Sequence, residues 1–320
     1  MRYRALGRTG YQVSEIGLGA WAMGGMWGPL GDSTSLKALQ YAIDRGINFF
    51  DTALAYGEGH SESLIAKAFR ERGERVTVAT KVPPKNYRWP AKPDDPLSKI
   101  FPSDWIILST ERSLENLETD CLDLQQLHVW TDAWTDQSEW YETLACLKEQ
   151  GKIRYFGVSV NDHDPDSVMR LVASGKIDTV QVIYNLFDQT PTDRLLPLCQ
   201  EKNVGVIARC PFDEGSLTGR LEESLPFHED DWRNRYFKGS RLQETLARVE
   251  KLKFLVHGER KSLAQAALKF CLSHPAVSTV IPGMRRPEHV EENCTVSDGL
   301  PLAPKELDQI KAHAWPRNFY

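Results

Sequence analysis

The sequence contains no uninterrupted run of eighteen apolar residues, and its N-terminal stretch, MRYRALGRTGYQVSEIG, lacks the apolar core of a signal peptide. It also has little excess charge, since 39 Lys and Arg residues face 44 Asp and Glu residues for a formal net charge of −5. A weakly acidic chain has no electrostatic reason to bind nucleic acid or an anionic membrane. We therefore expect a cytoplasmic protein with neither of these partners.

Closely spaced cysteines and histidines are also missing. The six cysteines are far apart and form no C-x-x-C pair, which predicts free, buried thiols in a reducing compartment. The eight histidines are scattered without the spacing of metal ligands. The nearest approach to a ligand cluster, residues 228–231 (HEDD), is expected to be a solvated acidic loop, so no metal site is predicted.

What the sequence does contain is a regular alternation of strand and helix patterns. It begins with a small hairpin, 3–6 and 11–13 around a Gly-Arg-Thr-Gly turn, which we expect to plug the floor of the fold. Eight extended runs follow, each succeeded by a helical pattern: 16–20, 48–50, 75–80, 122–127, 153–160, 179–184, 204–209 and 277–281. This pattern predicts an α/β fold of one domain, residues 1–320, as a (β/α)8 TIM barrel, with an open parallel sheet as the alternative.

Two loops are longer than ordinary connections, 83–103 and 211–240, and with the tail 312–320 they are expected to wall the C-terminal rim. The segment 17–22 (GLGAWA) matches the dinucleotide fingerprint G-x-G-x-x-A. A Rossmann fingerprint opens a helix directly, whereas a glycine-rich loop follows here. The context therefore argues against a Rossmann fold.

Three successive predicted strands bring an ionisable residue to one rim. Asp51 ends the first, Lys81 the second and His128 the third, and Tyr56 lies a turn beyond Asp51. Each residue alone has an ordinary structural explanation, such as a helix cap or a solvated charge. Because the C-terminal rim is where barrel enzymes place their chemistry, the common position of the four favours a catalytic site.

The four side chains suggest a proton-transfer site. A tyrosine phenol has an unperturbed pKa of about 10. A neighbouring ammonium favours the phenolate by about one to three units, so Lys81, held by Asp51, is expected to lower the pKa of Tyr56. Tyr56 would then donate a proton, and His128 would orient a substrate carbonyl.

Asp51, Tyr56, Lys81 and His128, in this order, resemble the catalytic tetrad of the aldo-keto reductase family, and the resemblance covers nearly the whole chain. It implies a barrel that reduces aldehydes or ketones with NADP(H), similar to the bacterial general-stress and channel β-subunit-like branch. Further segments resemble the family in the same order: 151–159 (GKIRYFGVS), 181–185 (QVIYN), 281–283 (IPG) and 292–293 (EN).

The resemblance also implies a cofactor site. It assigns Ser159, Asn161 and Gln181 to the nicotinamide carboxamide and Tyr184 to the face of the ring. The full implied set is Gly19, Trp21, Asp51, Ser159, Asn161, Gln181, Tyr184, Cys210, Pro211, Phe212, Gly215, Leu217, Arg220, Arg235, Gly283, Arg285, Arg286, Glu292 and Asn293.

Within that set, the loop after the seventh strand is expected to bind the pyrophosphate, with Arg235 favoured over Arg233 as a further phosphate contact. Arg285 and Arg286, just before Pro287, are expected to bind the extra phosphate of NADP(H) at a helix N-terminus. Glu292 and Asn293 resemble the pair that contacts the adenine. The sequence departs from the family at Arg209 and Cys210, where tyrosine and serine are usual.

We therefore expect a monomeric or weakly oligomeric reductase of small-molecule carbonyl compounds. Trp21, Trp27, Trp89 and Trp130 are predicted to line the substrate pocket, which would favour aromatic or medium-length apolar aldehydes over charged sugars. The alternative from another class is a nicotinamide-binding regulatory β-subunit with little turnover.

Overall fold

The computed structural model describes residues 1–28, 31–222 and 227–320. Its main sheet has eight parallel strands in consecutive order. These are β3 (Leu18–Gly19), β4 (Phe49–Asp51), β5 (Thr77–Val82), β6 (Leu122–Leu127), β7 (Ile153–Ser159), β8 (Thr179–Ile183), β9 (Gly205–Arg209) and β10 (Val277–Val280).

The sheet closes on itself. Parallel bridges join Ile16 to Val280 and Gly19 to Gly283, so the segment around β3 pairs with β10. At this seam a Cβ on Gly19 would lie only 2.7 Å from the carbonyl oxygen of Ile281, and only glycine lets the two edges approach so closely. The predicted (β/α)8 TIM barrel is therefore confirmed, and the open sheet is wrong.

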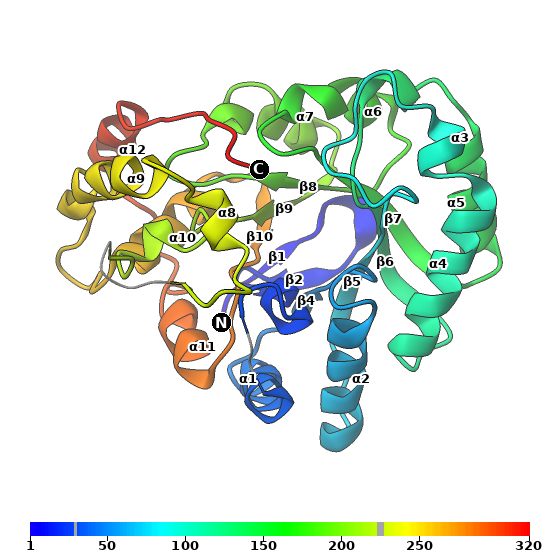
Figure 1. Ribbon diagram of the computed structural model, residues 1–320, viewed down its shortest axis with the longest axis horizontal. Helices are drawn as coiled ribbons and strands as arrows, with labels where there is room; N and C mark the ends of the chain where they lie inside the picture. Colours follow the sequence, from blue (N-terminus) through cyan, green and yellow to red (C-terminus); the bar gives the residue numbers. More distant parts are fainter. Residues whose placement is uncertain (29–30, 223–226) are drawn as a thin grey trace.

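Helices surround the strands on the outside of the barrel (Figure 1). Among the residues described, no helix is both long and apolar enough to span a bilayer. The helices are α1 (Asp32–Asp44), α2 (His60–Arg72), α3 (Leu97–Ile100), α4 (Ser103–Asn116), α5 (Glu139–Glu149), α6 (Met169–Ser174), α7 (Leu195–Glu201), α8 (Arg233–Tyr236), α9 (Arg241–Glu250), α10 (Leu263–Ser273), α11 (Pro287–Cys294) and α12 (Pro304–Lys311).

The N-terminal hairpin covers the floor of the barrel, as predicted. Its strands, β1 (Tyr3–Ala5) and β2 (Gln12–Ser14), pair antiparallel. Leu6 and Val13 are fully buried and join an apolar cluster that includes one residue from each of several barrel strands. Gly205, at the start of β9, permits this contact, because a Cβ there would lie 2.8 Å from the Leu6 side chain.

The C-terminal rim carries the long loops and the tail. The tail after α12 runs back over the barrel and ends close to β8 and β9 (Figure 1). Its last residue, Tyr320, stacks on Trp232 from the loop after β9, with ring centroids 5.4 Å apart. Residues 223–226 of that predicted loop, and residues 29–30 of the loop before α1, lie outside the described residues.

The main differences from the predicted elements lie in the second half of the chain. Neither α9 nor α12 was predicted. Both carry few buried residues, chiefly Thr245 and Val249 in α9 and Ile310 in α12, so most of each helix lies at the surface. The first predicted strand, 16–20, is reduced to Leu18–Gly19.

The cysteines only partly match expectation. All six are free thiols, as predicted. Three of them are buried, Cys199, Cys271 and Cys294, whereas Cys146 is exposed. Burial raises the pKa of Cys199 to about 12, so this thiol stays protonated and behaves as a small apolar side chain.

Candidate active site

Asp51 and Lys81 form a buried ion pair at the C-terminal rim. Lys81 Nζ lies 2.7 Å from Asp51 Oδ1 and also donates to the carbonyl oxygen of Thr52 at 2.7 Å. The other carboxylate oxygen of Asp51 accepts a hydrogen bond of 2.6 Å from Gln181 Nε2. The Lys81 side chain is fully buried. Every charge of this pair therefore has a close partner, which a buried ion pair requires.

Tyr56 is placed against the same lysine. Lys81 Nζ donates to Tyr56 Oη at 3.3 Å, so the phenol oxygen accepts from the ammonium and its own proton is free to point elsewhere. Gly24 makes room for the Tyr56 backbone, because a Cβ on Gly24 would lie 2.7 Å from the carbonyl carbon of Tyr56. The sequence prediction that Asp51, Tyr56 and Lys81 meet at one rim agrees with this geometry.

The prediction that the pKa of Tyr56 is lowered is wrong. Burial raises the pKa of Tyr56 well above its usual value, and the charge of Asp51 adds to the rise. The charge of Arg209 acts in the opposite direction. Lys81 does not lower the pKa as predicted because its ammonium is paired with Asp51 at a shorter distance. The phenol is therefore protonated at neutral pH.

His128 completes the group directly after β6. Its ring packs edge-on against Tyr56 and Trp89, with centroid distances of 5.7 and 5.5 Å. Burial lowers the pKa of His128 well below its usual value, and the nearby charges of Lys81 and Arg209 lower it further. The imidazole is therefore neutral, and its buried Nδ1 has no hydrogen-bond partner among the described residues.

Of the three residues assigned to the carboxamide, Ser159 ends β7 and is the register partner of Gln181 in the middle of β8, and Asn161 lies two residues beyond Ser159. Gln181 already donates to Asp51. Asn161 is held to the loop after β5, since its amide both donates to and accepts from the backbone of Ala91, at 2.8 and 3.2 Å. Asn161 therefore fixes that loop over the rim.

Tyr184 does not face the mouth, so the prediction that it covers the nicotinamide ring is wrong. It is buried and packs against Phe270 of α10, with ring centroids 5.0 Å apart. His274, just beyond α10, lies against its edge. The ring therefore fills the layer between the barrel and α10. The sequence motif locates the strand end correctly, but it does not show whether the ring points into the mouth of the barrel or outward toward α10.

Arg209, at the end of β9, is a charged residue of the rim that the sequence analysis identified only as a departure from the family. Its Nη2 donates to Asp162 Oδ1 at 2.6 Å and to the carbonyl oxygen of Val160 at 3.0 Å. Burial acts to lower the pKa of Arg209, but the Asp162 carboxylate raises it overall, so the guanidinium stays charged.

The loop after β9 is strained and connects to α11. Cys210, Asp213 and Glu214 all have a positive φ, between 45° and 53°, a conformation that non-glycine residues rarely adopt and that clusters at functional sites. Arg220 donates to Glu292 of α11 at 2.6 Å, so these two predicted cofactor residues meet. The same loop contains four more residues that were predicted to bind the cofactor: Pro211, Phe212, Gly215 and Leu217. Leu217 is fully buried.

The predicted phosphate residues differ in their surroundings. Arg285 is half-buried and donates to the carbonyl oxygens of Trp27 and Gly28, at 3.0 and 3.4 Å. Arg286 is exposed at the N-terminal end of α11. Of the two candidates in the long loop, Arg233 is held by Asp231 at 2.6 Å, whereas Arg235 is exposed.

The remaining cofactor predictions lie along the same rim. Gly19 stands at the barrel seam, and Gly283 opposite it has open space where a Cβ would be. Asn293 is buried in α11. Glu292 accepts from Ser262 Oγ at 2.7 Å in addition to Arg220, so both of its oxygens are engaged.

Three of the four tryptophans predicted to line the pocket belong to rim segments. Trp89 is 40% exposed and lies beside His128. Trp21 packs edge-on against Trp27, at 6.1 Å between centroids. Trp130 is fully buried and packs in the core against two further tryptophans, at 5.0 and 5.8 Å. Its predicted contact with substrate is therefore wrong.

Sequence reasoning missed a buried acid beside this rim. Glu214 Oε1 accepts from Tyr320 Oη at 2.5 Å and lies 3.6 Å from Cys210 Sγ. Burial raises the pKa of Glu214 to about 7. The signal in the sequence was weak, because Tyr320 lies 106 residues away and only folding brings the two together.

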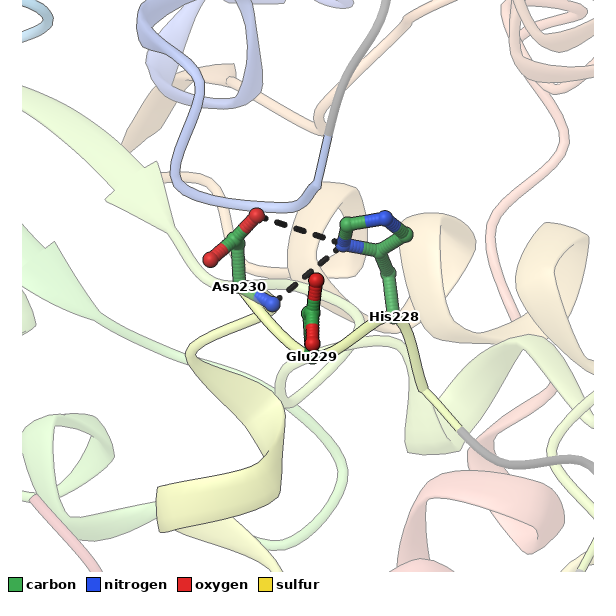
Figure 2. Close-up of side chains that lie close together, drawn as sticks. All are labelled: His228, Glu229 and Asp230. Carbon is green, nitrogen blue, oxygen red and sulfur yellow. Dashed lines mark hydrogen bonds and ion pairs between the residues drawn. The ribbon is translucent and has the colours of Figure 1, made fainter.

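One group of three potential metal ligands occurs in the described part of the chain: His228, Glu229 and Asp230 (Figure 2). All three are exposed, as expected for the solvated acidic loop of the sequence analysis. His228 Nδ1 accepts from the backbone N–H of Asp230 at 3.2 Å and lies 3.6 Å from its carboxylate.

Comparisons with known proteins agree with this geometry. The sequence profile of the Aldo/keto reductase family matches residues 15–314. Aldo-keto reductase YhdN from Bacillus subtilis is 34% identical over 297 residues, which cover 91% of this chain and 87% of that protein. A probable voltage-gated potassium channel subunit beta from Oryza sativa is 31% identical, with 98% and 96% covered.

A solved structure shares both the sequence pattern and the fold. An aldo/keto reductase from Klebsiella pneumoniae in complex with NADP and acetate superimposes with a TM-score of 0.71 at 26% identity, covering 99% of this chain and 98% of that one. The chain therefore belongs to the aldo/keto reductase family.

Proposed function

We propose that this protein is an oxidoreductase that transfers a hydride from NADPH to the carbonyl carbon of an aldehyde or ketone, with Tyr56 as the proton donor. The observation that carries the proposal is the position of Lys81 Nζ, 2.7 Å from Asp51 and 3.3 Å from Tyr56 Oη in a buried site. A protonated phenol held in this way is a general acid aimed at the mouth of the barrel.

The residues of the tetrad divide the work between them. Asp51 compensates the buried ammonium of Lys81, and Lys81 in turn donates to the phenol oxygen. As the proton leaves Tyr56, negative charge develops on that oxygen, and the ammonium stabilises it. Neutral His128, packed edge-on against Tyr56, donates to the substrate carbonyl oxygen and orients it.

The rim fits an extended nicotinamide dinucleotide. Ser159 and Gln181 are partners on neighbouring strands, and Gln181 donates to Asp51 of the tetrad. Arg286 is exposed at the N-terminal end of α11, where a helix favours phosphate. Gly283 leaves open space on the path between them. When bound, this cofactor supplies the hydride that no side chain can store. The Klebsiella relative in complex with NADP supports this assignment.

The substrate pocket is proposed to prefer aromatic or medium-length apolar aldehydes. Trp89 is exposed beside His128, and Trp21 and Trp232 pack edge-on, 5.8 Å apart, on the opposite loops. Large rings of this kind bind apolar groups by burying area and stacking. Charged sugars would have to give up water to the same rings without equivalent hydrogen bonds.

The test is turnover of a carbonyl panel with purified protein. Benzaldehydes, medium-chain aldehydes and charged sugars are assayed with NADPH and with NADH, and the Tyr56→Phe variant is the matched control. We expect NADPH-dependent reduction, with higher kcat/KM for the benzaldehydes than for the sugars. Higher kcat/KM for charged sugars would refute the substrate class, and no turnover with any carbonyl would refute the reductase.

A second candidate follows from the potassium channel subunit beta among the relatives. In this alternative the chain binds the nicotinamide cofactor as a regulatory subunit and turns over little. The same panel separates the two functions. Tight NADPH binding without measurable reduction of any carbonyl would favour the regulatory subunit, whereas multiple turnovers would favour the reductase.

A further inference from the structure

Arg209 reaches across the C-terminal rim. It ends β9, where its backbone pairs with Ile183 of β8. Its guanidinium binds the carbonyl oxygen of Val160 and the carboxylate of Asp162, both in the segment after β7. The side chain therefore passes from β9 across the end of β8 to β7, and β8 is the strand that carries Gln181.

The guanidinium lies next to the predicted carboxamide site, because Val160, to which it donates, follows Ser159 and donates its own N–H to the carbonyl oxygen of Gln181. Its Nε is buried and has no hydrogen-bond partner within the described ranges. Arg209 lowers the pKa of Tyr56, Lys81 and His128 through its charge. The guanidinium therefore lies beside Ser159 and Gln181, and its charge acts on the tetrad.

We propose that Arg209 makes the site bind the reduced nicotinamide cofactor more tightly than the oxidised one. This inference rests on the proposed function, which places the nicotinamide beside Ser159 and Gln181. The nicotinamide ring carries a positive charge when oxidised and none when reduced. A fixed guanidinium beside the ring repels only the oxidised form, whereas every contact to the phosphates and the adenine is common to both forms.

The expected preference is on the order of tenfold. Two unit charges several ångströms apart interact strongly near a protein surface, and the Asp162 carboxylate offsets part of that repulsion. A tenfold ratio of dissociation constants corresponds to a change of about 30 mV in the potential of the bound two-electron couple. The consequence is early release of the oxidised cofactor after turnover, a step that often limits the rate of such enzymes.

The experiment compares dissociation constants measured by isothermal titration for NADP⁺ and NADPH. The wild-type protein is compared with Arg209→Leu, which removes the charge, and with Asp162→Asn, which removes the counter-charge and keeps an oxygen acceptor. We expect the ratio Kd(NADP⁺)/Kd(NADPH) to fall about tenfold in Arg209→Leu. In Asp162→Asn the ratio should rise, because the repulsion is no longer offset. Arg209→Lys, which keeps the charge, should stay close to wild type.

Two controls separate this effect from other causes. 2′-Phospho-ADP-ribose lacks the nicotinamide, so Arg209→Leu should leave its dissociation constant unchanged. Arg170→Leu removes an exposed arginine that is also paired with aspartates, and it should leave the ratio unchanged. If Arg209→Leu fails to fold, Asp162→Asn still decides the question through the direction of its shift.

The possible outcomes are distinct. A ratio that falls in Arg209→Leu and rises in Asp162→Asn supports the inference. Equal weakening of both cofactor forms, or a ratio that does not move in either variant, overturns it while leaving the proposed reductase intact. If neither form binds the wild-type protein, the proposed function fails and this inference fails with it.

Discussion

Replacing Glu214 with glutamine is expected to change how the stability of this protein depends on pH. Glu214 is 4% exposed and accepts a hydrogen bond from Tyr320 Oη at 2.5 Å. Burial raises its pKa to about 7, and the charge of neighbouring Asp213 adds to the rise. Glutamine has nearly the same shape and can accept the same hydrogen bond, but it carries no charge to bury.

The direction of the pH dependence follows from whether the folded or the unfolded chain binds the proton of Glu214 more tightly. Below pH ~4.5, Glu214 is protonated both in the folded and in the unfolded chain and contributes no penalty. As the pH rises from about 4.5 to about 7, the unfolded chain ionises while the folded chain keeps its proton, so the folded state loses stability. Above pH ~7 the full penalty applies. A shift of about 2.5 units corresponds to about 3 kcal/mol.

The assay is urea unfolding of wild type and Glu214→Gln at pH 5 and pH 8. Comparing the two proteins at each pH removes the contribution of all other titrating groups. The free energy of unfolding of Glu214→Gln, measured relative to wild type, should be about 2–3 kcal/mol higher at pH 8 than at pH 5. A difference that is the same at both pH values would refute an elevated pKa for Glu214.

A second variant tests the same carboxyl from the other side. Tyr320→Phe removes the hydroxyl that donates to Glu214, and this hydrogen bond works to lower the pKa of the acid. The ionised carboxylate then loses a donor. We therefore expect Tyr320→Phe to be destabilised more at pH 8 than at pH 5, the opposite trend to Glu214→Gln. Equal destabilisation at both pH values would show that Tyr320 acts by packing alone.

Three further predictions concern the rim. Tyr56→Phe should lower kcat by about two to four decades and leave NADPH affinity nearly unchanged, because it removes the proton donor alone; near-normal kcat at neutral pH would contradict the mechanism. Lys81→Met leaves the Asp51 carboxylate buried without its partner and should cost about 3–5 kcal/mol in urea unfolding. Adding Asp51→Asn to Lys81→Met should recover part of that stability. If the double variant instead loses the sum of the two single losses, Asp51 and Lys81 are not coupled. Wild type should bind NADP(H) at least about tenfold more tightly than NAD(H), and Arg285→Ala/Arg286→Ala should lose this preference in binding titrations; a double variant that keeps it would exclude both arginines.

The barrel was predictable because its signal is local. Residues 122–127 were predicted as a strand and form β6 with the same bounds, and a helix, α5, follows this strand as the predicted alternation requires. In a parallel barrel every strand ends at the same rim. Because Asp51 and Lys81 were each predicted to end a strand, they could be predicted to lie at the same rim, even though 30 residues separate them.

The direction of individual side chains was less predictable. Trp130 and Tyr184 both follow or end predicted strands, and both were assigned to the mouth. In the structure each packs into the helical layer or the core instead. Beyond a strand end the alternation of faces no longer applies, so packing with distant residues such as Phe270 decides where a ring points.

The pKa of Tyr56 shows why proximity alone does not determine electrostatics. The sequence places an ammonium near the phenol, which predicts a lowered pKa. In the structure Asp51 lies closer to that ammonium than Tyr56 does, so the pair presents little net charge and burial dominates. The remaining positive influence on the phenol comes from Arg209, whose guanidinium is paired with Asp162. A phenol that stays protonated at neutral pH suits proton donation to a carbonyl oxygen, and the ammonium then stabilises the phenolate only as it forms.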